Sequence, residues 1–77
     1  MKNHSIQKLR LLYIIDILSR KSDEEHPLSA TDIMDYLRED YCIECERKTI
    51  YDCIENLNEY GYEIIKSQSP RGYFMTP

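Results

Sequence analysis

The chain has 77 residues, of which 42% are hydrophobic and 31% are charged, and this profile predicts one small globular domain with a thin core. No apolar run approaches the roughly 20 residues that a membrane-spanning helix needs, and nothing resembles a signal peptide. Three cysteines, an odd number, argue against a secreted disulfide framework and favour the reducing cytoplasm. A deep catalytic cleft is hard to build from so short a chain, so we do not expect an enzyme.

Charge is distributed unevenly along the chain. The formal net charge is −4, whereas a nucleic-acid-binding protein is usually basic. Residues 1–21 carry five basic side chains and one acidic one, a net charge of +4, whereas residues 22–46 carry nine acidic side chains and one basic one, a net charge of −8. Residues 47–77 carry four of each. We therefore expect any partner to bind a locally charged part of the surface, because the charge of the chain is not uniform.

The first predicted helix covers residues 6–20, with Ser5 as a candidate N-cap because its hydroxyl can accept from a first-turn N–H. At about 100° per residue the apolar positions fall into two stripes. The stripes consist of Ile6, Leu9, Tyr13 and Ile17, and of Leu11, Ile14, Ile15 and Leu18. A surface helix needs only one such stripe. Either this domain covers both stripes, or one of them meets another subunit or a further C-terminal domain.

The second predicted helix covers residues 30–40 and follows a charged loop and a very short strand at Pro27–Leu28. Ser29 is the expected N-cap, and Asp32, three residues later, completes a capping box. The first-turn N–H groups near Ser29 and Thr31 are candidates for a phosphate contact. Against this contact, Asp32 already occupies the positive end of the helix as a cap.

The third predicted helix covers residues 47–60 and ends at Gly61, because glycine tolerates the left-handed conformation that ends helices. Two segments rich in β-forming residues follow, at 62–66 and 73–75, and turn-forming residues lie between them at 68–72. This pattern predicts a hairpin over residues 62–75. Helix, short strand, helix, connector, helix and hairpin describe a winged helix-turn-helix. The predicted fold is therefore mainly α, with three helices and one small β-hairpin, the wing.

The start of the third helix favours DNA binding, because in helix-turn-helix proteins this part of the motif enters the major groove. The candidate DNA-contacting residues of this helix are Arg47, Lys48, Thr49, Tyr51, Asp52 and Asn56. The two cations can neutralise phosphates or reach guanine acceptors, the hydroxyls can contact bases, and the Asp carboxylate can accept from cytosine. The alternative is an ordinary solvated helix start.

The hairpin tip supplies two further candidates, Ser69 and Arg71. A wing normally lies along the DNA backbone or the minor groove, and an arginine suits either place. The alternative interpretation is a type I or II turn with a solvated arginine.

The cysteines and histidines give a weaker pattern. Cys42 and Cys45 have the C-x-x-C spacing of a zinc or redox site, but a structural zinc ion needs four ligands. The other candidates are Cys53, His4 and His26, none of them in a second closely spaced pair. Small buried thiols are the favoured interpretation, and neither a metal nor a cofactor is predicted. Neither histidine has a Ser, Cys or carboxylate at a telling spacing, so neither is assigned a catalytic role.

A family resemblance extends over nearly the whole chain. It rests on segments 8–14, 27–30, 46–52, 59–62 and 71–73, above all on the Arg-Lys-Thr-Ile-Tyr-Asp motif and the later Tyr-Gly turn. In these segments the chain resembles the N-terminal winged helix-turn-helix of bacterial WYL-domain transcriptional regulators. The residues that match the recognition motif of that family are Arg47, Lys48, Thr49 and Tyr51.

This resemblance implies a third helix that reads DNA as part of a homodimer. It also implies a longer regulator, with a ligand-sensing C-terminal domain, from which a chain ending at Pro77 is truncated. Two residues depart from the family pattern. Glu46 stands where related repressors often place a serine cap, and Cys53 stands where many relatives carry an acid.

The sequence as a whole predicts a sequence-specific DNA-binding domain of a cytoplasmic bacterial transcription regulator. Its predicted partners are double-stranded DNA and a second copy, paired through the first helix or through a C-terminal domain. The alternative is a winged-helix protein–protein interaction module without DNA binding, which the excess of acid and the spare apolar stripe of the first helix favour.

Overall fold

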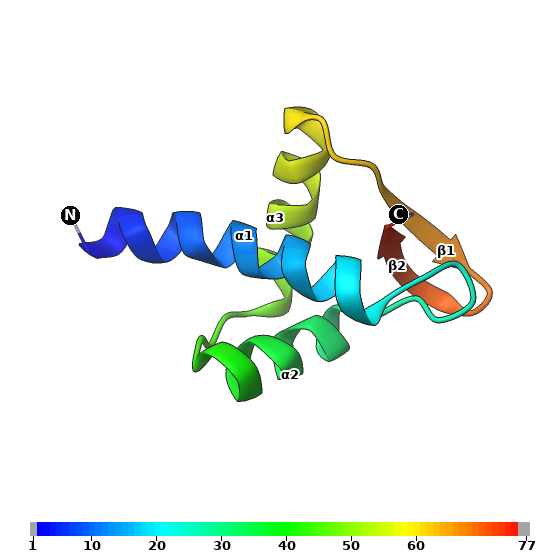
Figure 1. Cartoon of the computed structure of the whole chain (residues 1–77), viewed down its shortest axis with the longest axis horizontal. Coiled ribbons are helices and arrows are strands. Elements are labelled where there is room, and N and C mark those ends of the chain that lie inside the picture. The colour runs from blue at the N-terminus through cyan, green and yellow to red at the C-terminus, as the bar shows by residue number, and fades with distance from the viewer. Residues whose placement is uncertain (1, 76–77) are drawn as a thin grey trace.

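We describe the protein from a computed structural model, which describes the backbone of residues 2–75 and the side chains of residues 8–75. The elements in chain order are α1 (Lys2–Lys21), α2 (Ala30–Tyr41), α3 (Arg47–Tyr60), β1 (Ile64–Gln68) and β2 (Arg71–Met75). Helix α1 extends along the long axis of the molecule, and the two strands form an antiparallel hairpin near its C-terminal end (Figure 1). The predicted three-helix winged helix-turn-helix is confirmed.

Helix α1 begins at Lys2, four residues before its predicted start. Ser5 therefore lies inside the helix, and its prediction as the N-cap is wrong. A serine is only a local preference for a helix start, and nothing in residues 2–4 breaks the helix before it. The side chains of residues 1–7, Ile6 among them, lie outside the described part of the chain.

The inner face of α1 is a single stripe that draws on both predicted stripes. Ile14, Ile17 and Leu18 are at most 1% exposed. Leu11 and Ile15, on one side of this face, are only partly buried. Leu12, which belongs to neither predicted stripe, is 56% exposed. The domain therefore buries the part of the helix surface where the two predicted stripes meet, and the residues on the far side of each stripe are closer to solvent.

Helix α2 starts with the predicted capping box. The N–H of Asp32 donates to the Ser29 hydroxyl at 3.1 Å, and the Asp32 carboxylate accepts from the Ser29 N–H, also at 3.1 Å. The helix ends at Tyr41, one residue later than predicted, and Cys42 adopts the left-handed conformation with φ of 57°. Its N–H donates to the carbonyl of Arg38, which satisfies a free carbonyl at the helix end.

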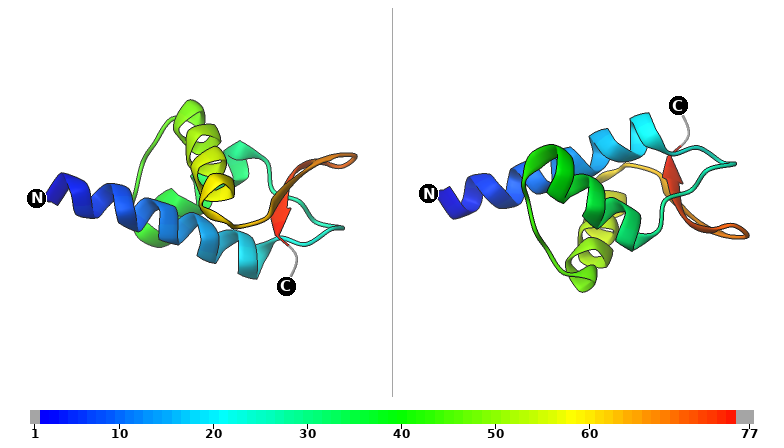
Figure 2. Two further views of the ribbon diagram at one scale, coloured as in Figure 1. Left: turned by 90° about the horizontal axis from the view of Figure 1, so that it is seen from above. Right: turned by 90° about the horizontal axis from the view of Figure 1, so that it is seen from below.

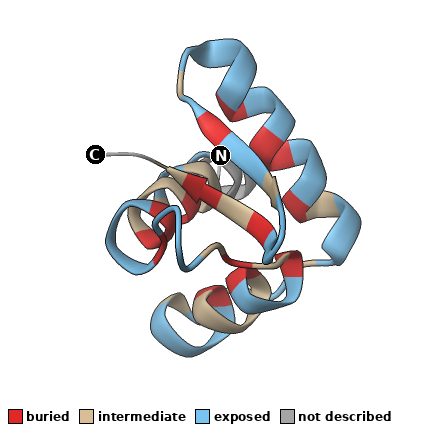
Figure 3. Ribbon diagram, turned by 90° about the vertical axis from the view of Figure 1, so that its right-hand side faces the viewer, coloured by how far each residue is buried: buried red, intermediate tan, exposed pale blue. Residues whose placement is uncertain are grey.

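Helix α3 has its predicted bounds, and Gly61 ends it as expected. Gly61 has φ of 133° and donates its N–H to the carbonyl of Leu57 at 3.2 Å. The buried face of this helix consists of Ile50, Cys53, Ile54 and Leu57. Together with the buried faces of α1 and α2 and with residues from both strands, these side chains form one core. The buried residues are red in Figure 3.

In the hairpin, residues 64–68 pair with residues 71–75, which leaves Ser69 and Pro70 as the turn. The predicted hairpin over 62–75 is confirmed, with strands that continue closer to the turn than the sequence suggested. The Ser69–Pro70 peptide bond is cis.

The predicted short strand at Pro27–Leu28 is reduced to one backbone bridge. The N–H of Leu28 donates to the carbonyl of Tyr73 at 2.8 Å, and the N–H of Tyr73 donates to the carbonyl of Leu28 at 2.7 Å. Gly72 has φ of +155°, and a Cβ at this position would lie 2.8 Å from the carbonyl carbon of Leu28. Glycine therefore permits this close approach, which holds the hairpin beside the start of α2.

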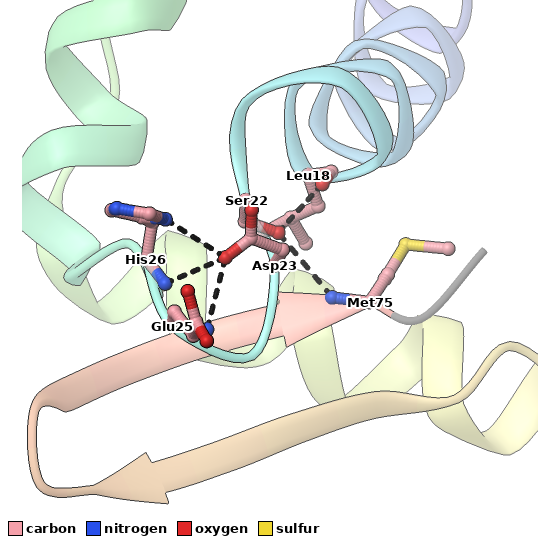
Figure 4. A network of polar contacts seen from close by, with 6 residues as sticks. All are labelled: Leu18, Ser22, Asp23, Glu25, His26 and Met75. Carbon is pink, nitrogen blue, oxygen red and sulfur yellow. Dashed lines mark hydrogen bonds and ion pairs between the residues drawn. The ribbon is translucent and has the colours of Figure 1, made fainter.

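The loop after α1 is ordered by polar contacts (Figure 4). The Ser22 hydroxyl donates to the carbonyl of Leu18 at 2.6 Å and accepts from the N–H of Met75 at 3.3 Å. The carboxylate of Asp23 accepts from the backbone N–H of His26 at 2.7 Å and lies 3.0 Å from its Nδ1. The sequence interpretation missed this pairing of His26 with a carboxylate. The hydrogen bond from the His26 side chain is the main reason that the pKa of Asp23 is lowered from its ordinary value of 3.8.

No helix in the described residues combines the length and the apolar character needed to cross a membrane.

Candidate nucleic-acid interface

The first turn of α3 presents its two cations to solvent. Arg47 and Lys48 are exposed, as are Tyr51 and Asp52, whereas Thr49 is half-buried. Glu46, the N-cap residue, makes no side-chain hydrogen bond to the helix start. This agrees with the expectation that a glutamate here removes a preferred cap. The end of α3 that enters DNA in helix-turn-helix proteins is therefore open to a partner.

Arg47 also joins the starts of the two motif helices. Its guanidinium donates to the hydroxyl of Thr31 in the first turn of α2 at 3.1 Å. Two predicted DNA-contacting residues, 16 positions apart in the chain, are thus brought together. The contact holds the guanidinium near both helix starts and uses one acceptor site of the Thr31 hydroxyl.

The hairpin adds a second cationic element beside the same helix starts. A hollow of about 300 Å³ is lined by Ser29, Ala30, Tyr51, Lys66, Arg71, Gly72 and Tyr73. The aromatic rings of Tyr51 and Tyr73 lie 6.3 Å apart between centroids, at an angle of 56°. In both views of Figure 2 the hairpin and the loop before α2 project from the same side of the molecule, away from the N-terminus.

Burial raises the pKa of the Tyr73 hydroxyl above its ordinary value of 10.0. The neighbouring Tyr51 adds to this rise, and the positive charge of Arg71 opposes it. At neutral pH the Tyr73 hydroxyl therefore keeps its proton as a hydrogen-bond donor.

Arg47, Lys48, Thr49 and Thr31 do not line the hollow, and neither do three other candidate residues, Asn56, Ser69 and Asp52. Asn56 lines a separate apolar groove of about 670 Å³ between α1 and α3, together with Lys8, Leu11, Leu12, Ile15, Leu57, Tyr60 and Tyr62. Ser69 is exposed in the hairpin turn, and Asp52 is exposed on α3. Of these three, only Asp52 belongs to the first turns of α3. The structure therefore gathers most of the predicted residues at one end of α3 and leaves Asn56 at the other.

The sequence interpretation missed Lys66, which lies directly opposite Tyr73 in the hairpin. Opposite residues of an antiparallel pair point to the same face. A two-residue turn at Ser69 and Pro70 would have revealed this register. The predicted turn at 68–72 was too long to do so.

The sequence interpretation also missed an acidic line on the outer face of α3. Glu55 and Glu59 follow Lys48 and Asp52 along the helix at three- and four-residue spacings, and all four are exposed. Residues at this spacing share a helix face. The helical periodicity that placed the core residues could have found this line.

The three thiols are in different environments. Cys53 is buried, as predicted, whereas Cys42 is exposed, so the prediction of a buried thiol is wrong for Cys42. This residue lies at the end of α2, outside the packed face. Cys45 is half-buried. Burial raises the pKa of both Cys45 and Cys53, and the positive charge of Arg10 opposes both rises. Among the described residues no three His, Cys, Asp or Glu side chains converge on a metal position.

Comparison with protein-family models, with curated proteins and with solved structures finds no match to this chain. The resemblance to WYL-domain regulators therefore stays a prediction.

Proposed function

We propose that this chain is a sequence-specific DNA-binding domain of a bacterial transcription regulator that works in the cytoplasm. In this proposal α3 enters the major groove, and the hairpin contacts the backbone or the minor groove of the duplex. One observation carries the proposal. The cations Arg47 and Lys48 are exposed at the first turn of α3, with the cationic hairpin beside the same helix starts.

The charges on α3 support entry by its N-terminal end. Arg47 and Lys48 attract phosphates, whereas Glu55 and Glu59, exposed further along the helix, repel them. A helix that lay flat in the groove would bring these acids close to the backbone. We therefore expect α3 to tilt, so that Thr49 and Tyr51 reach base edges while the acidic end stays outside the groove.

Affinity in this proposal comes mainly from phosphate contacts, and sequence preference comes from a few side chains of α3. One module makes few contacts, and its net charge of −4 opposes approach to DNA. The isolated domain should therefore bind weakly. The predicted homodimer, through α1 or a C-terminal domain, stays a prediction that the molar mass in solution decides. No covalent chemistry is proposed.

A salt titration of binding to a short duplex of random sequence tests this function. We expect the logarithm of the association constant to fall steeply with the logarithm of salt concentration, because bound cations release counterions from DNA. Arg47→Ala and Lys48→Ala should each reduce the slope by about 1. Lys8→Ala is the control, because it removes one cation from the groove between α1 and α3 and should leave the slope unchanged.

The alternative function is a winged-helix protein–protein interaction module without DNA binding. The acidic line on α3 and the acid excess of the chain favour this alternative. It predicts no duplex binding by the folded domain even at low salt. That result in the same titration would exclude the proposed function.

A further inference from the structure

The hollow between the hairpin and the two motif helices differs in charge from the chain as a whole. Acidic residues outnumber basic ones by four in the sequence. The described residues that line the hollow nevertheless include two cations, Lys66 and Arg71, and no acid. Its other side-chain polar groups are the hydroxyls of Ser29, Tyr51 and Tyr73. A concave surface with this lining attracts an anion.

The backbone holds the two cations on the same face of the hairpin. Lys66 lies opposite Tyr73, and Arg71 lies two residues before Tyr73 on the same strand. Opposite residues share a face in an antiparallel pair, as do alternate residues along a strand. The bridge between Leu28 and Tyr73, with Gly72 packed on the Leu28 backbone, fixes this face against the start of α2.

The start of α2 contributes less to anion binding than its position suggests. Asp32 accepts the Ser29 N–H, and the Ser29 hydroxyl accepts the Asp32 N–H. The capping box therefore occupies these two N–H groups and adds a negative charge nearby, while the Ser29 hydroxyl keeps its own proton to donate. Attraction for an anion in the hollow comes instead from Lys66 and Arg71, with tyrosine hydroxyls available as donors.

We propose that this hollow binds one phosphate group of the DNA backbone, held jointly by Lys66 and Arg71. The inference rests on the proposed function and makes it more specific. It places the hairpin on the backbone and not in the minor groove, and it adds Lys66 to the DNA-contacting residues. A phosphodiester has one negative charge and several acceptor sites, which match a pair of cations better than a base edge does.

The test is a double-mutant cycle on the salt dependence of binding to a random duplex. It compares the wild type with Lys66→Ala, Arg71→Ala and the double variant. If both cations hold one phosphate, either of them still neutralises it alone, so each single variant keeps most of the slope. The double variant then loses about 0.9 from the slope, the value for one phosphate.

A matched double variant, Lys8→Ala/Arg20→Ala, controls for the loss of two positive charges. Both residues are exposed on α1, outside the hollow, so this variant should keep the wild-type slope. Lys66 and Arg71 are exposed as well, and unchanged thermal unfolding midpoints will show that all variants fold.

Three results would overturn the inference in different ways. A double variant with an unchanged slope would exclude any phosphate in the hollow while leaving the proposed function intact. A loss of about 1.8 in the double variant, shared equally by the single variants, would mean two separate phosphates. Without duplex binding, binding of inorganic phosphate by the wild type but not by the double variant would assign the hollow to a free anion. In that last case the proposed function fails as well.

Discussion

The two ends of α3 differ in charge although they belong to one helix with one buried face. The N-terminal end presents Arg47 and Lys48 beside the cationic hairpin. The C-terminal end presents Glu55 and Glu59, beside an apolar groove against α1. Packing is therefore continuous along the helix, and only the surface charge distinguishes the end that we propose to approach DNA.

The charges at the ends of α2 provide a comparison for those at the ends of α3. It has an acid, Asp32, in its first turn and a base, Arg38, in its last turn, the arrangement that the helix dipole favours. Helix α3 has no acid in its first turn, no base in its last turn and two cations at its start. These charges oppose the dipole, so helix stability does not explain them. The proposed DNA partner would explain them, because its phosphates are attracted to cations at this end.

The largest expected effect tests whether both ends of α3 are equally anchored. Ile50, near the cationic end, is 0% exposed, and Leu57, near the acidic end, is 4% exposed. Ile50→Ala and Leu57→Ala should each lower the free energy of unfolding by about 2–5 kcal/mol, because each leaves a cavity in the core. Urea unfolding measures both values. A loss below about 1 kcal/mol for Ile50→Ala alone would show that the cationic end is loosely held.

The next effect concerns the two glycines, one at the end of α3 and one in strand β2. Gly61 ends α3 and Gly72 holds the hairpin against Leu28, and both have positive φ. A Cβ at Gly61 meets no atom within 4 Å, whereas a Cβ at Gly72 would lie 2.8 Å from the Leu28 backbone. Gly61→Ala should therefore cost about 1–3 kcal/mol of stability from strain alone.

Gly72→Ala should cost more than Gly61→Ala, since it adds a backbone clash to a similar strain, and it should also weaken duplex binding by displacing the hairpin. Thermal unfolding and anisotropy measure the two quantities. Equal losses of stability in the two variants, with equal affinity for DNA, would argue against a hairpin fixed by the Leu28 contact.

Some parts of the fold follow from residues that are close together in the sequence. The capping box at Ser29 and Asp32 and the stop at Gly61 depend on residues a few positions apart, so the sequence predicts them. The start of α1 was misplaced, because a candidate cap such as Ser5 competes with the helical preference of the residues before it.

The candidate site is less predictable, because it depends on contacts between distant segments. The motif at 47–52 identified the cationic end of α3. The hydrogen bond from Arg47 to Thr31 and the placement of Lys66 depend on packing and on strand register. A one-residue change of register moves every side chain of a strand to its other face. A sequence interpretation with an overlong turn therefore could not identify Lys66.

A smaller effect, on DNA binding, comes from reversing the charge at each end of α3. Lys48→Glu should reduce the salt slope of duplex binding by about 1, yet leave stability equal or about 0.3–1 kcal/mol higher, because an acid suits a helix N-terminus. Glu59→Lys should raise the affinity slightly and leave the slope nearly unchanged. Anisotropy titrations and urea unfolding separate these effects. Changes of affinity that are equal in size and opposite in sign would mean that net charge alone matters, and would remove the distinction between the ends.

The smallest effect separates the position of an acid from the net charge of the chain. Asp23 is exposed in the loop after α1, and Asp23→Asn removes one negative charge, as Glu59→Gln does. If position matters, only Glu59→Gln should raise duplex affinity measurably. Equal gains would mean that the net charge governs binding.

The variant Asp23→Asn also tests whether the contact between Asp23 and His26 stabilises the fold, through the dependence of stability on pH. The folded pKa of Asp23 is lowered below 3.8, first of all by the hydrogen bond from His26. The ionised carboxylate therefore contributes stability fully above pH 3.8, and this contribution is lost as the pH falls through the folded pKa. Asp23→Asn should show a slightly shallower loss of stability on acidification than the wild type, measured by urea unfolding from neutral pH to below pH 3.8. An identical acid limb in the two proteins would show that the contact with His26 adds nothing to folding, and the loop would then act through its charge alone.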